Sequence, residues 1–413
     1  MTRGQRCRPV LHPAWVACLL ALPLAAQAQQ WTWQPDASAR SESNTNPGLV
    51  AEPGPVRSTS TLSTRVAAAR STENTETRAE TELRLSPSDS RRERRLLGQA
   101  ALSHRLSAPR NTWAATFKTQ ADRSLDNPTS AADVGVGATE RTVSDALLSW
   151  TYQLTERLSS DTDASHSRTR YGTLTTGSDF DLSALNAGLR YRLRETTQVG
   201  ATVSHTQQRA TGSSQPTTIN GWRVSASESL SEISSATLSV GQSTTTRDFT
   251  QRSLVCPLQV QLCQAGLVAF VVAESSQTLR NRDLQYSVSA DLRWSETTQL
   301  AMRVSRALAT NALGVTRDDR LGVNINRALS ETTTAGLSYD ESRSRAERAL
   351  SGAGAPTLRA LSLTLAHRWD ERWSVNGQLL QRQFTSVTPQ LRARATVFSI
   401  SLQYQGGIVS IWR

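Results

Sequence analysis

The segment Asp283–Trp294 reads DLQYSVSADLRW and carries the pattern from which the fold can be predicted. Its apolar residues occupy every second position from Leu284 to Trp294, and polar residues fill the positions between them. Side chains alternate between the two faces of a β-strand, whereas a helix would group them at intervals of three and four residues. The segment therefore predicts a strand with one apolar and one polar face.

The ends of six predicted strands carry a repeated signature. Six times Leu or Trp is followed by one polar residue and then by Glu, and successive glutamates lie 39, 37, 64, 35 and 40 residues apart. Such a unit accommodates one β-hairpin and one further connection. The six copies are Leu154-Thr155-Glu156, Leu193-Arg194-Glu195, Leu230-Ser231-Glu232, Trp294-Ser295-Glu296, Leu329-Ser330-Glu331 and Trp369-Asp370-Glu371.

The length of the alternating segments favours strands that cross a membrane. They run for about 12 residues, and a tilted strand needs roughly 9 to 11 to span a bilayer. Beyond residue 28, the longest apolar run is Leu267–Ala273, which is too short for a membrane helix. Counting segments gives about 18 strands, with short turns at the Glu positions and longer polar loops at the opposite end. We therefore predict an all-β fold, a transmembrane antiparallel up-and-down outer-membrane β-barrel.

A soluble extracellular all-β repeat protein, such as a solenoid or a sandwich array, is the alternative architecture. Alternation alone does not say what the apolar face touches. Solenoid coils are shorter, at roughly 20 to 30 residues, and have more regular corner residues. A closed barrel also leaves no unpaired strand edge, which could not survive in lipid.

The N-terminus predicts export. Arg3, Arg6 and Arg8 precede an apolar stretch, and Ala26-Gln27-Ala28 forms a small-residue cleavage site. We expect residues 1–28 to be a Sec signal peptide cleaved near Ala28, and residues 29–413 to form one barrel domain. The expected location is the outer membrane of a Gram-negative cell.

Two cysteines remain after the leader, Cys256 and Cys263. An exported protein meets an oxidising environment, so we expect a disulfide between them. They lie in the longest interval of the repeat, which predicts a long external loop at about residues 248–279. This loop is a candidate plug or docking element, or an ordinary surface loop.

Aromatic residues gather near the short turns. Such residues form girdles where a barrel meets the membrane interface. The predicted periplasmic girdle consists of Trp113, Trp150, Tyr152, Tyr191, Trp294, Trp369 and Trp373.

Two short motifs carry a family resemblance. Ser41–Leu49 (SESNTNPGL) is an Asn-rich strand end followed by a polar loop, and Leu189–Leu193 (LRYRL) is a repeated type of strand end. The layout resembles the β-barrel porins of Gram-negative bacteria, and especially the outer-membrane proteins associated with PEP-CTERM/exosortase systems. The resemblance implies an association with exopolysaccharide and protein-sorting loci.

The sequence does not indicate an enzyme. It contains no H-E-x-x-H, G-x-S-x-G, G-x-G-x-x-G or Walker-type motif. His166 with Asp161 and Asp163 is the most site-like local group, but a solvated strand residue is the simpler interpretation. We predict no catalytic residue, no cofactor and no metal site.

The charge balance points to an anionic partner. The formal net charge is +11, and Lys118 is the single lysine, so almost all basic residues are arginines. Arg190, Arg192, Arg293 and Arg368 fall on the polar phase of their strands and are candidate lumen-facing residues. They would favour small anions or acidic glycans, unless acidic residues across the lumen neutralise them.

The expected function is therefore a porin-like passive channel. The alternative is a closed or plugged barrel that serves as a structural or docking component of a surface-polysaccharide or protein-sorting assembly. Expected partners are outer-membrane lipid, lipopolysaccharide and the barrel-assembly machinery. Nucleic acid is not expected, because the chain lacks basic-aromatic stripes and is exported.

Overall fold

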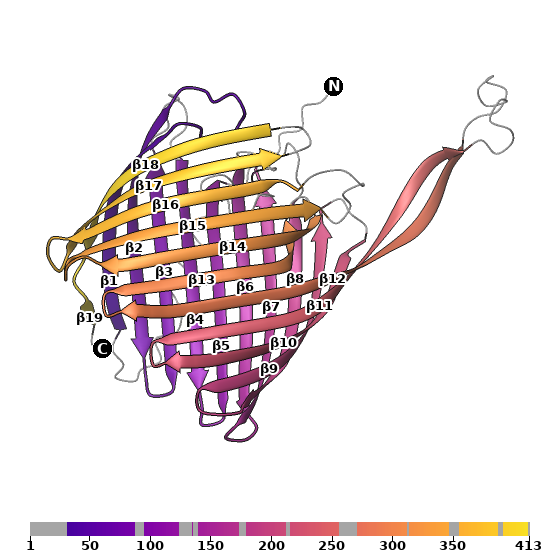
Figure 1. The fold of residues 1–413 in the computed structure, drawn as a ribbon, viewed down its shortest axis with the longest axis horizontal. Coiled ribbons are helices and arrows are strands. Elements are labelled where there is room, and N and C mark those ends of the chain that lie inside the picture. Colours follow the sequence, from indigo (N-terminus) through magenta and orange to yellow (C-terminus); the bar gives the residue numbers. More distant parts are fainter. Residues whose placement is uncertain are drawn as a thin grey trace.

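The computed structural model describes residues 31–86, 95–123, 134, 139–172, 179–211, 215–255, 271–311, 314–346, 355–386 and 391–411. Within these residues, strands β1 to β18 pair antiparallel with their neighbours in sequence, and β1 also pairs with β18 (Figure 1). The sheet therefore closes into an antiparallel barrel, as predicted. No helix among these residues is long and apolar enough to cross a membrane.

The strands follow one another around the wall in chain order. They are β1 (Trp31–Asn44), β2 (Arg57–Ser71), β3 (Thr75–Ser86), β4 (Arg95–Ser107), β5 (Asn111–Arg123), β6 (Glu140–Gln153), β7 (Leu158–Tyr171), β8 (Phe180–Arg192), β9 (Thr197–Ala210), β10 (Thr217–Ser231), β11 (Ser234–Val255), β12 (Val271–Ser295), β13 (Thr298–Asn311), β14 (Gly314–Ala328), β15 (Thr333–Ala346), β16 (Thr357–Arg368), β17 (Trp373–Ser386), β18 (Leu391–Gln405) and the short β19 (Val409–Ile411).

The two ends of the barrel differ in the length of their connections. From β2 to β16, each even-numbered strand joins the next odd-numbered one through a short turn, such as residues 72–74 or 369–372. At the other end most connections are longer, as at residues 45–56 and 124–139, whereas the links at 312–313 and 387–390 are as short as the turns. This is the predicted asymmetry between short turns and long loops.

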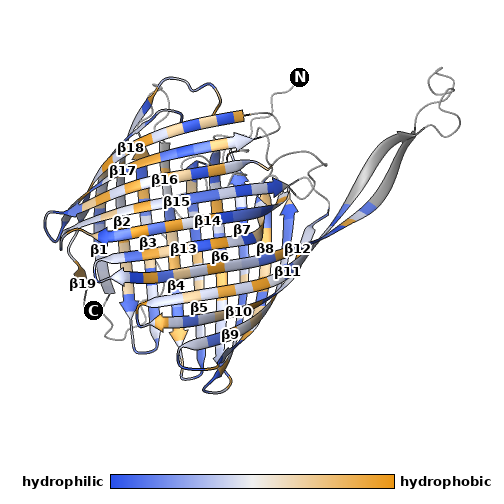
Figure 2. Ribbon diagram, in the orientation of Figure 1, coloured by the Kyte–Doolittle hydropathy of each residue, from blue (hydrophilic) through white to orange (hydrophobic). Residues whose placement is uncertain are grey.

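One phase of each strand presents apolar side chains to the outside. Leu185, Leu189, Leu363 and Phe398 are each about half exposed, as are similar residues around the wall. Figure 2 shows apolar and polar positions alternating along the strands. The two buried apolar clusters among the described residues are small. The outer apolar surface, rather than an interior core, is therefore the main hydrophobic feature, as expected for a wall that faces lipid.

The last strand extends further than Tyr404. Residues Val409–Ile411 of β19 resume the pairing with β1 opposite Trp31–Trp33, after an interruption at Gly406. The partner there is Pro35, which has no amide hydrogen to donate, and its carbonyl accepts the Gly406 amide at 2.7 Å. β1 advances by three residues from Asp36 to Trp33, while its partner advances by four from Gln405 to Val409. The one extra residue forms a β-bulge opposite the proline.

The predicted loop at residues 248–279 is wrong in its secondary structure. Within it, the described residues 248–255 and 271–279 continue β11 and β12, and they pair in register as far as Val255 and Val271. The resulting hairpin projects away from the barrel wall instead of entering it (Figure 1). The sequence indicated a loop because apolar and polar residues do not alternate regularly over residues 248–279. Cys256 and Cys263 lie outside the described residues, as do the leader and Trp412.

The two faces of β8 provide a test of the membrane-facing phase. Leu185 points outward at mid-strand, whereas its neighbour Asn186 lies on the inward phase opposite Asp163. We expect Leu185→Arg to lower the free energy of unfolding by about 2–4 kcal/mol, the cost of an arginine on the lipid face near the bilayer midplane. The control Asn186→Arg should change it little. Urea unfolding in phospholipid vesicles measures both, and equal effects would contradict the assignment of faces.

Candidate functional site: the inner wall and mouth of the barrel

The phase opposite the exposed apolar residues lines the lumen. On β18, Ala393, Ala395 and Val397 are buried while the alternate residues Arg394 and Phe398 are exposed. Side chains from connections elsewhere in the chain pack against the buried phase. Strand register then assigns the inward phase on every neighbouring strand.

Ion pairs connect β1, β2 and β3 across the inner wall. Arg65 on β2 donates to Glu80 on β3 at 2.8 Å, and its other terminal nitrogen lies 3.8 Å from Asp36 on β1. Further along β3, the Arg84 and Glu82 side chains pair at 2.6 Å. Gln99 of β4 donates to the same glutamate at 2.9 Å. Acid and base therefore alternate on this part of the wall.

Among the described residues, the most enclosed inward ion pair with a bidentate geometry joins β5 and β6. Arg141 donates from Nε and Nη2 to the two carboxylate oxygens of Asp122, at 2.9 and 2.8 Å. Gln120 donates to the same carboxylate at 2.7 Å. The side chains are only 20% and 11% exposed, so each charge depends on its partner for solvation.

The four candidate lumen arginines differ in their contacts. Arg190 lies on the inward phase of β8 and is bound by both oxygens of Asp161 on β7, with its Nε at 2.6 Å from one of them. Arg293 and Arg368 lie at the short-turn end, where they donate to the carbonyls of Glu296 at 2.9 Å and Glu331 at 3.5 Å. Arg192 is an exposed residue at the end of β8, also near a short turn. The structure therefore places the four at or near one mouth, and one of them is neutralised by an aspartate.

A buried cluster narrows the opposite mouth, and sequence reasoning missed it. Leu49, from the β1–β2 connection, packs with Leu358, Phe384 and Ala393 on the inner face of β16 to β18, and it is 3% exposed. Leu49 has a φ of 47°, an uncommon conformation for a bulky residue. Asn46 beside it is 2% exposed and exchanges hydrogen bonds with the backbone of Val50, at 2.8 and 3.1 Å.

Two further contacts reach across this mouth. Val134 lies between β5 and β6 in the sequence, yet it belongs to the cluster on β16 to β18. β5 and β18 are five strand spacings apart, or about 24 Å along the wall, so the side chain lies far from the strands that flank it. Gln208 of β9 donates to the carbonyl of Asn311 at the end of β13, at 3.0 Å. Local periodicity could not have revealed these contacts.

The seven predicted girdle residues lie at the short-turn end. Each is within three residues of a strand end there, and all are on the outward phase or in the adjoining turn. Trp113 stacks on Trp150 at a centroid distance of 5.4 Å. Trp373 contacts Tyr404, which was not among the predicted residues, at 4.9 Å.

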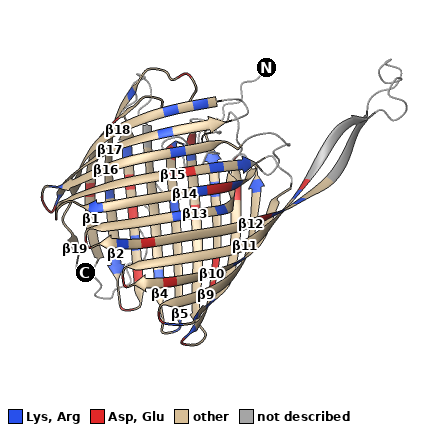
Figure 3. Cartoon of the chain, viewed as in Figure 1, with Lys and Arg blue, Asp and Glu red and all other residues tan. Residues whose placement is uncertain are grey.

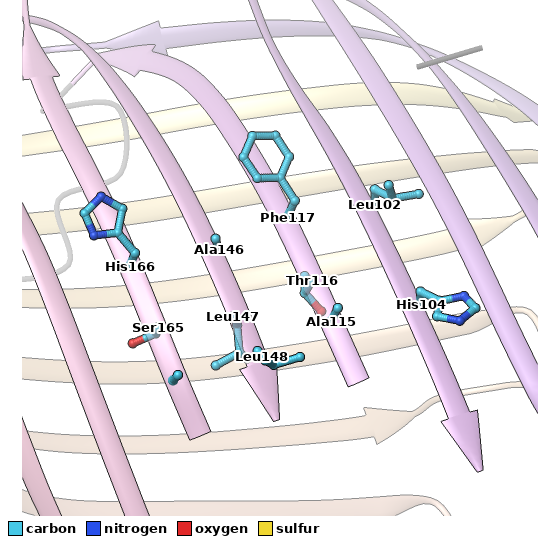
Figure 4. A pocket seen from close by; sticks show the side chains of 11 residues that line it. Leu102, His104, Ala115, Thr116, Phe117, Ala146, Leu147, Leu148, Ser165 and His166 are labelled. Atoms are coloured by element: carbon cyan, nitrogen blue, oxygen red, sulfur yellow. The ribbon is translucent and has the colours of Figure 1, made fainter. Parts of the chain in front are cut away.

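The histidines do not form a site. His166 faces outward, whereas Asp161 and Asp163 lie on the inward phase of the same strand, so alternation separates the group that looked most site-like in sequence. His166 and His104 border a shallow apolar depression of about 430 Å³ on the outer wall (Figure 4). No group of three His, Cys, Asp or Glu in the described part of the chain could hold a metal ion.

No protein-family model and no curated protein matches the chain. Among solved structures, it is similar to OpdK from Pseudomonas aeruginosa, crystallised with vanillate, with 8% identity and a TM-score of 0.48 over 92% of this chain and 99% of OpdK. OccAB1 from Acinetobacter baumannii gives 8% identity and a TM-score of 0.47 over 92% and 97%. The FrpB iron transporter from Neisseria meningitidis (F3-3 variant) gives 10% and 0.47 over 88% of this chain and 62% of FrpB. The chain thus spans about three fifths of the FrpB length, and its function has to be argued from its own residues.

The Asp122–Arg141 pair provides a test of charge pairing in the wall. Arg141→Met removes the partner of a carboxylate that is only 11% exposed on its side chain, and we expect it to lower the free energy of unfolding by about 1–3 kcal/mol. The double variant Arg141→Met/Asp122→Asn should be more stable than Arg141→Met alone, because no unpaired charge remains. Urea unfolding in vesicles measures both. A double variant that is no more stable than Arg141→Met alone would show that the two side chains act independently.

Proposed function

We propose that the protein is a porin-like passive channel of the Gram-negative outer membrane. The outward apolar phase supports a membrane location, because a barrel in water would not leave so many large apolar side chains exposed. The inward phase supports passage of polar solutes, since it carries hydroxyls, amides and paired charges. A barrel of this strand number leaves a water-filled channel unless loops fill it.

The observation that carries the proposal is the charged but balanced inner wall. The pairs Arg65–Glu80, Arg141–Asp122 and Arg190–Asp161 place both signs on the surface that a solute would pass. A wall of one sign would select strongly, whereas alternating signs leave a weak net field. We infer a modest preference for small anions or acidic glycans, which arises from Arg192, Arg293 and Arg368 near the short-turn mouth.

The contacts at the other mouth support a size limit. Asn46, Leu49 and Val134 pack on the inner face of the wall there, and Gln208 reaches Asn311. These contacts fix side chains inside the opening. The channel is therefore narrower at the long-connection mouth than a bare ring of strands would be.

The proposal is non-enzymatic. Its finer form, service to an exopolysaccharide or PEP-CTERM sorting system, rests on the family resemblance in sequence. A docking role for the β11–β12 hairpin is the second candidate, because this hairpin is the feature that reaches furthest from the wall (Figure 1).

Single-channel recording in a planar bilayer tests the proposal. We expect discrete conductance steps and a small anion preference in a salt gradient. Arg190→Ser/Arg192→Ser/Arg293→Ser should shift the reversal potential toward cations, whereas Asp161→Asn, which frees Arg190 from its partner, should shift it toward anions. Silence from folded, inserted protein, or shifts of the same sign in both variants, would contradict the proposal.

Deletion of residues 250–278 separates a plug from an external element. Because the described part of this hairpin projects away from the wall, we expect unchanged conductance and selectivity in the same recordings (Figure 1). An increase in conductance would show that the hairpin tip obstructs the lumen.

A further inference from the structure

Four arginines form an outward-facing cluster near the long-connection end of the barrel. Arg343 and Arg345 lie on β15, and Arg392 and Arg394 lie on β18; all four are exposed. Figure 3 shows basic positions at these ends of the strands. On β18 they share the phase of Phe398, so they point away from the lumen and follow directly after the apolar surface.

Strand register places the cluster in two rows. Arg394 on β18 is opposite Gln383 on β17, which is opposite Arg359 on β16. Two residues further from the apolar surface, the second row contains Arg392 on β18 and Arg343 on β15. Thr385 and Thr357 occupy the positions between them on β17 and β16. β15 and β18 are three strand spacings apart, so each row extends over about 14 Å. On β15 the first row ends at Glu341, and Arg345 lies two residues beyond the second row.

The height of the cluster matches a membrane interface. Arg394 is ten residues from Tyr404, and Arg359 is ten residues from Trp369, where Tyr404 and Trp369 lie at the aromatic end. Ten residues cover about 33 Å along a strand, or about 25 Å along the barrel axis at a tilt of roughly 40°. An outer-membrane barrel has an apolar band about 25 Å tall. The arginines therefore lie where the hydrocarbon of the opposite leaflet ends.

None of these four arginines forms an ion pair within 4 Å in the described part of the chain, although Asp319 lies opposite Arg343 in the register and Glu341 lies two residues before it. Other outward arginines at the same end have acidic partners, such as Arg306 with Asp319 at 2.5 Å. Arg359 likewise pairs with Glu341 at 3.1 Å. Arg345, Arg392 and Arg394 thus have neither an ion pair nor an acidic cross-strand neighbour within the described residues, so this outward surface is positively charged and attracts anionic groups of the membrane.

The backbone beneath the cluster is held in place from the inside. Asn46 donates to the carbonyl of Arg394 at 3.0 Å, and the amide of Thr396 donates to the hydroxyl of Thr45 at 2.8 Å. Ala393 and Ala395, which alternate with the arginines, are almost completely buried against the Leu49 cluster. The start of β18 is therefore fixed before a ligand arrives, which reduces the entropy lost on binding.

We propose that this cluster binds the phosphate groups of a phosphorylated glycolipid in the outer leaflet. The proposal rests on the membrane location proposed above. Guanidinium groups form paired, charge-assisted hydrogen bonds with phosphate, and they are less strongly hydrated than ammonium groups. A second copy of this chain does not fit the same surface, because two identical clusters would bring like charges together.

Binding to lipid A in detergent micelles tests this site. The probe is diphosphorylated lipid A, compared with the same lipid after removal of its phosphates, and the titration uses the full mature chain. We expect the wild-type protein to prefer the phosphorylated form by about tenfold or more, and the preference to weaken as salt is raised. Arg343→Gln/Arg345→Gln/Arg392→Gln/Arg394→Gln should abolish the preference.

Two double variants distinguish loss of binding from a folding defect, and one control variant distinguishes it from a general effect of charge. Arg343→Gln/Arg345→Gln and Arg392→Gln/Arg394→Gln should each reduce the preference. The control Arg40→Gln/Arg78→Gln removes the same charge from the inward phase, where each arginine has an adjacent glutamate, and should leave it intact. Equal binding of both lipid forms by folded wild-type protein, or a preference retained in the fourfold variant, overturns the site. Conductance recorded in bilayers free of glycolipid tests the channel independently.

Discussion

The pairing of β1 with β18 holds the barrel closed. This pair runs from Asp36 opposite Gln405 to Asn44 opposite Val397, and together with the short β1–β19 pairing it joins the two ends of the chain. Without it, two strand edges with unpaired amides and carbonyls would remain, at a cost that a hydrocarbon environment does not offset. Closure also separates an inside from an outside, and every later feature follows from that separation.

Closure imposes different requirements on the two faces. The outer face has only to be apolar, and Leu, Val and aromatic residues meet that requirement without specific partners. The inner face carries charge in a confined space, so its arginines and acidic residues are arranged in pairs between neighbouring strands, as in Arg65–Glu80 and Arg141–Asp122. Balanced pairing stabilises the wall and limits the field available for selecting ions. In the channel that we propose, this balance predicts weak selectivity. The two rims also differ, because aromatic side chains such as Trp113 and Trp150 lie at the short-turn rim, whereas exposed arginines such as Arg392 and Arg394 lie at the opposite one.

The class of fold, the strand number and the asymmetry of the two ends are encoded locally in the sequence. Period-two alternation in segments such as Asp283–Trp294 and the six Glu turns are local signals that recur along the chain. For the same reason the aromatic positions near the turns follow from the sequence pattern alone. The extended β11–β12 hairpin escaped prediction because it stands clear of the wall and has no apolar face to maintain.

Which charges meet is a property of the tertiary structure. Alternation shows that Arg190 and Asp161 both lie on the polar face of their strands. Which acid Arg190 meets depends on the register between β7 and β8, and that register is set by the whole sheet. Alternation likewise separated His166 from Asp161, although the two are five positions apart in sequence. The packing of Leu49 and Val134 against β16 to β18 exists only after closure. Closure brings residues from opposite ends of the chain into contact, and a pattern within one short segment contains no information about such long-range contacts.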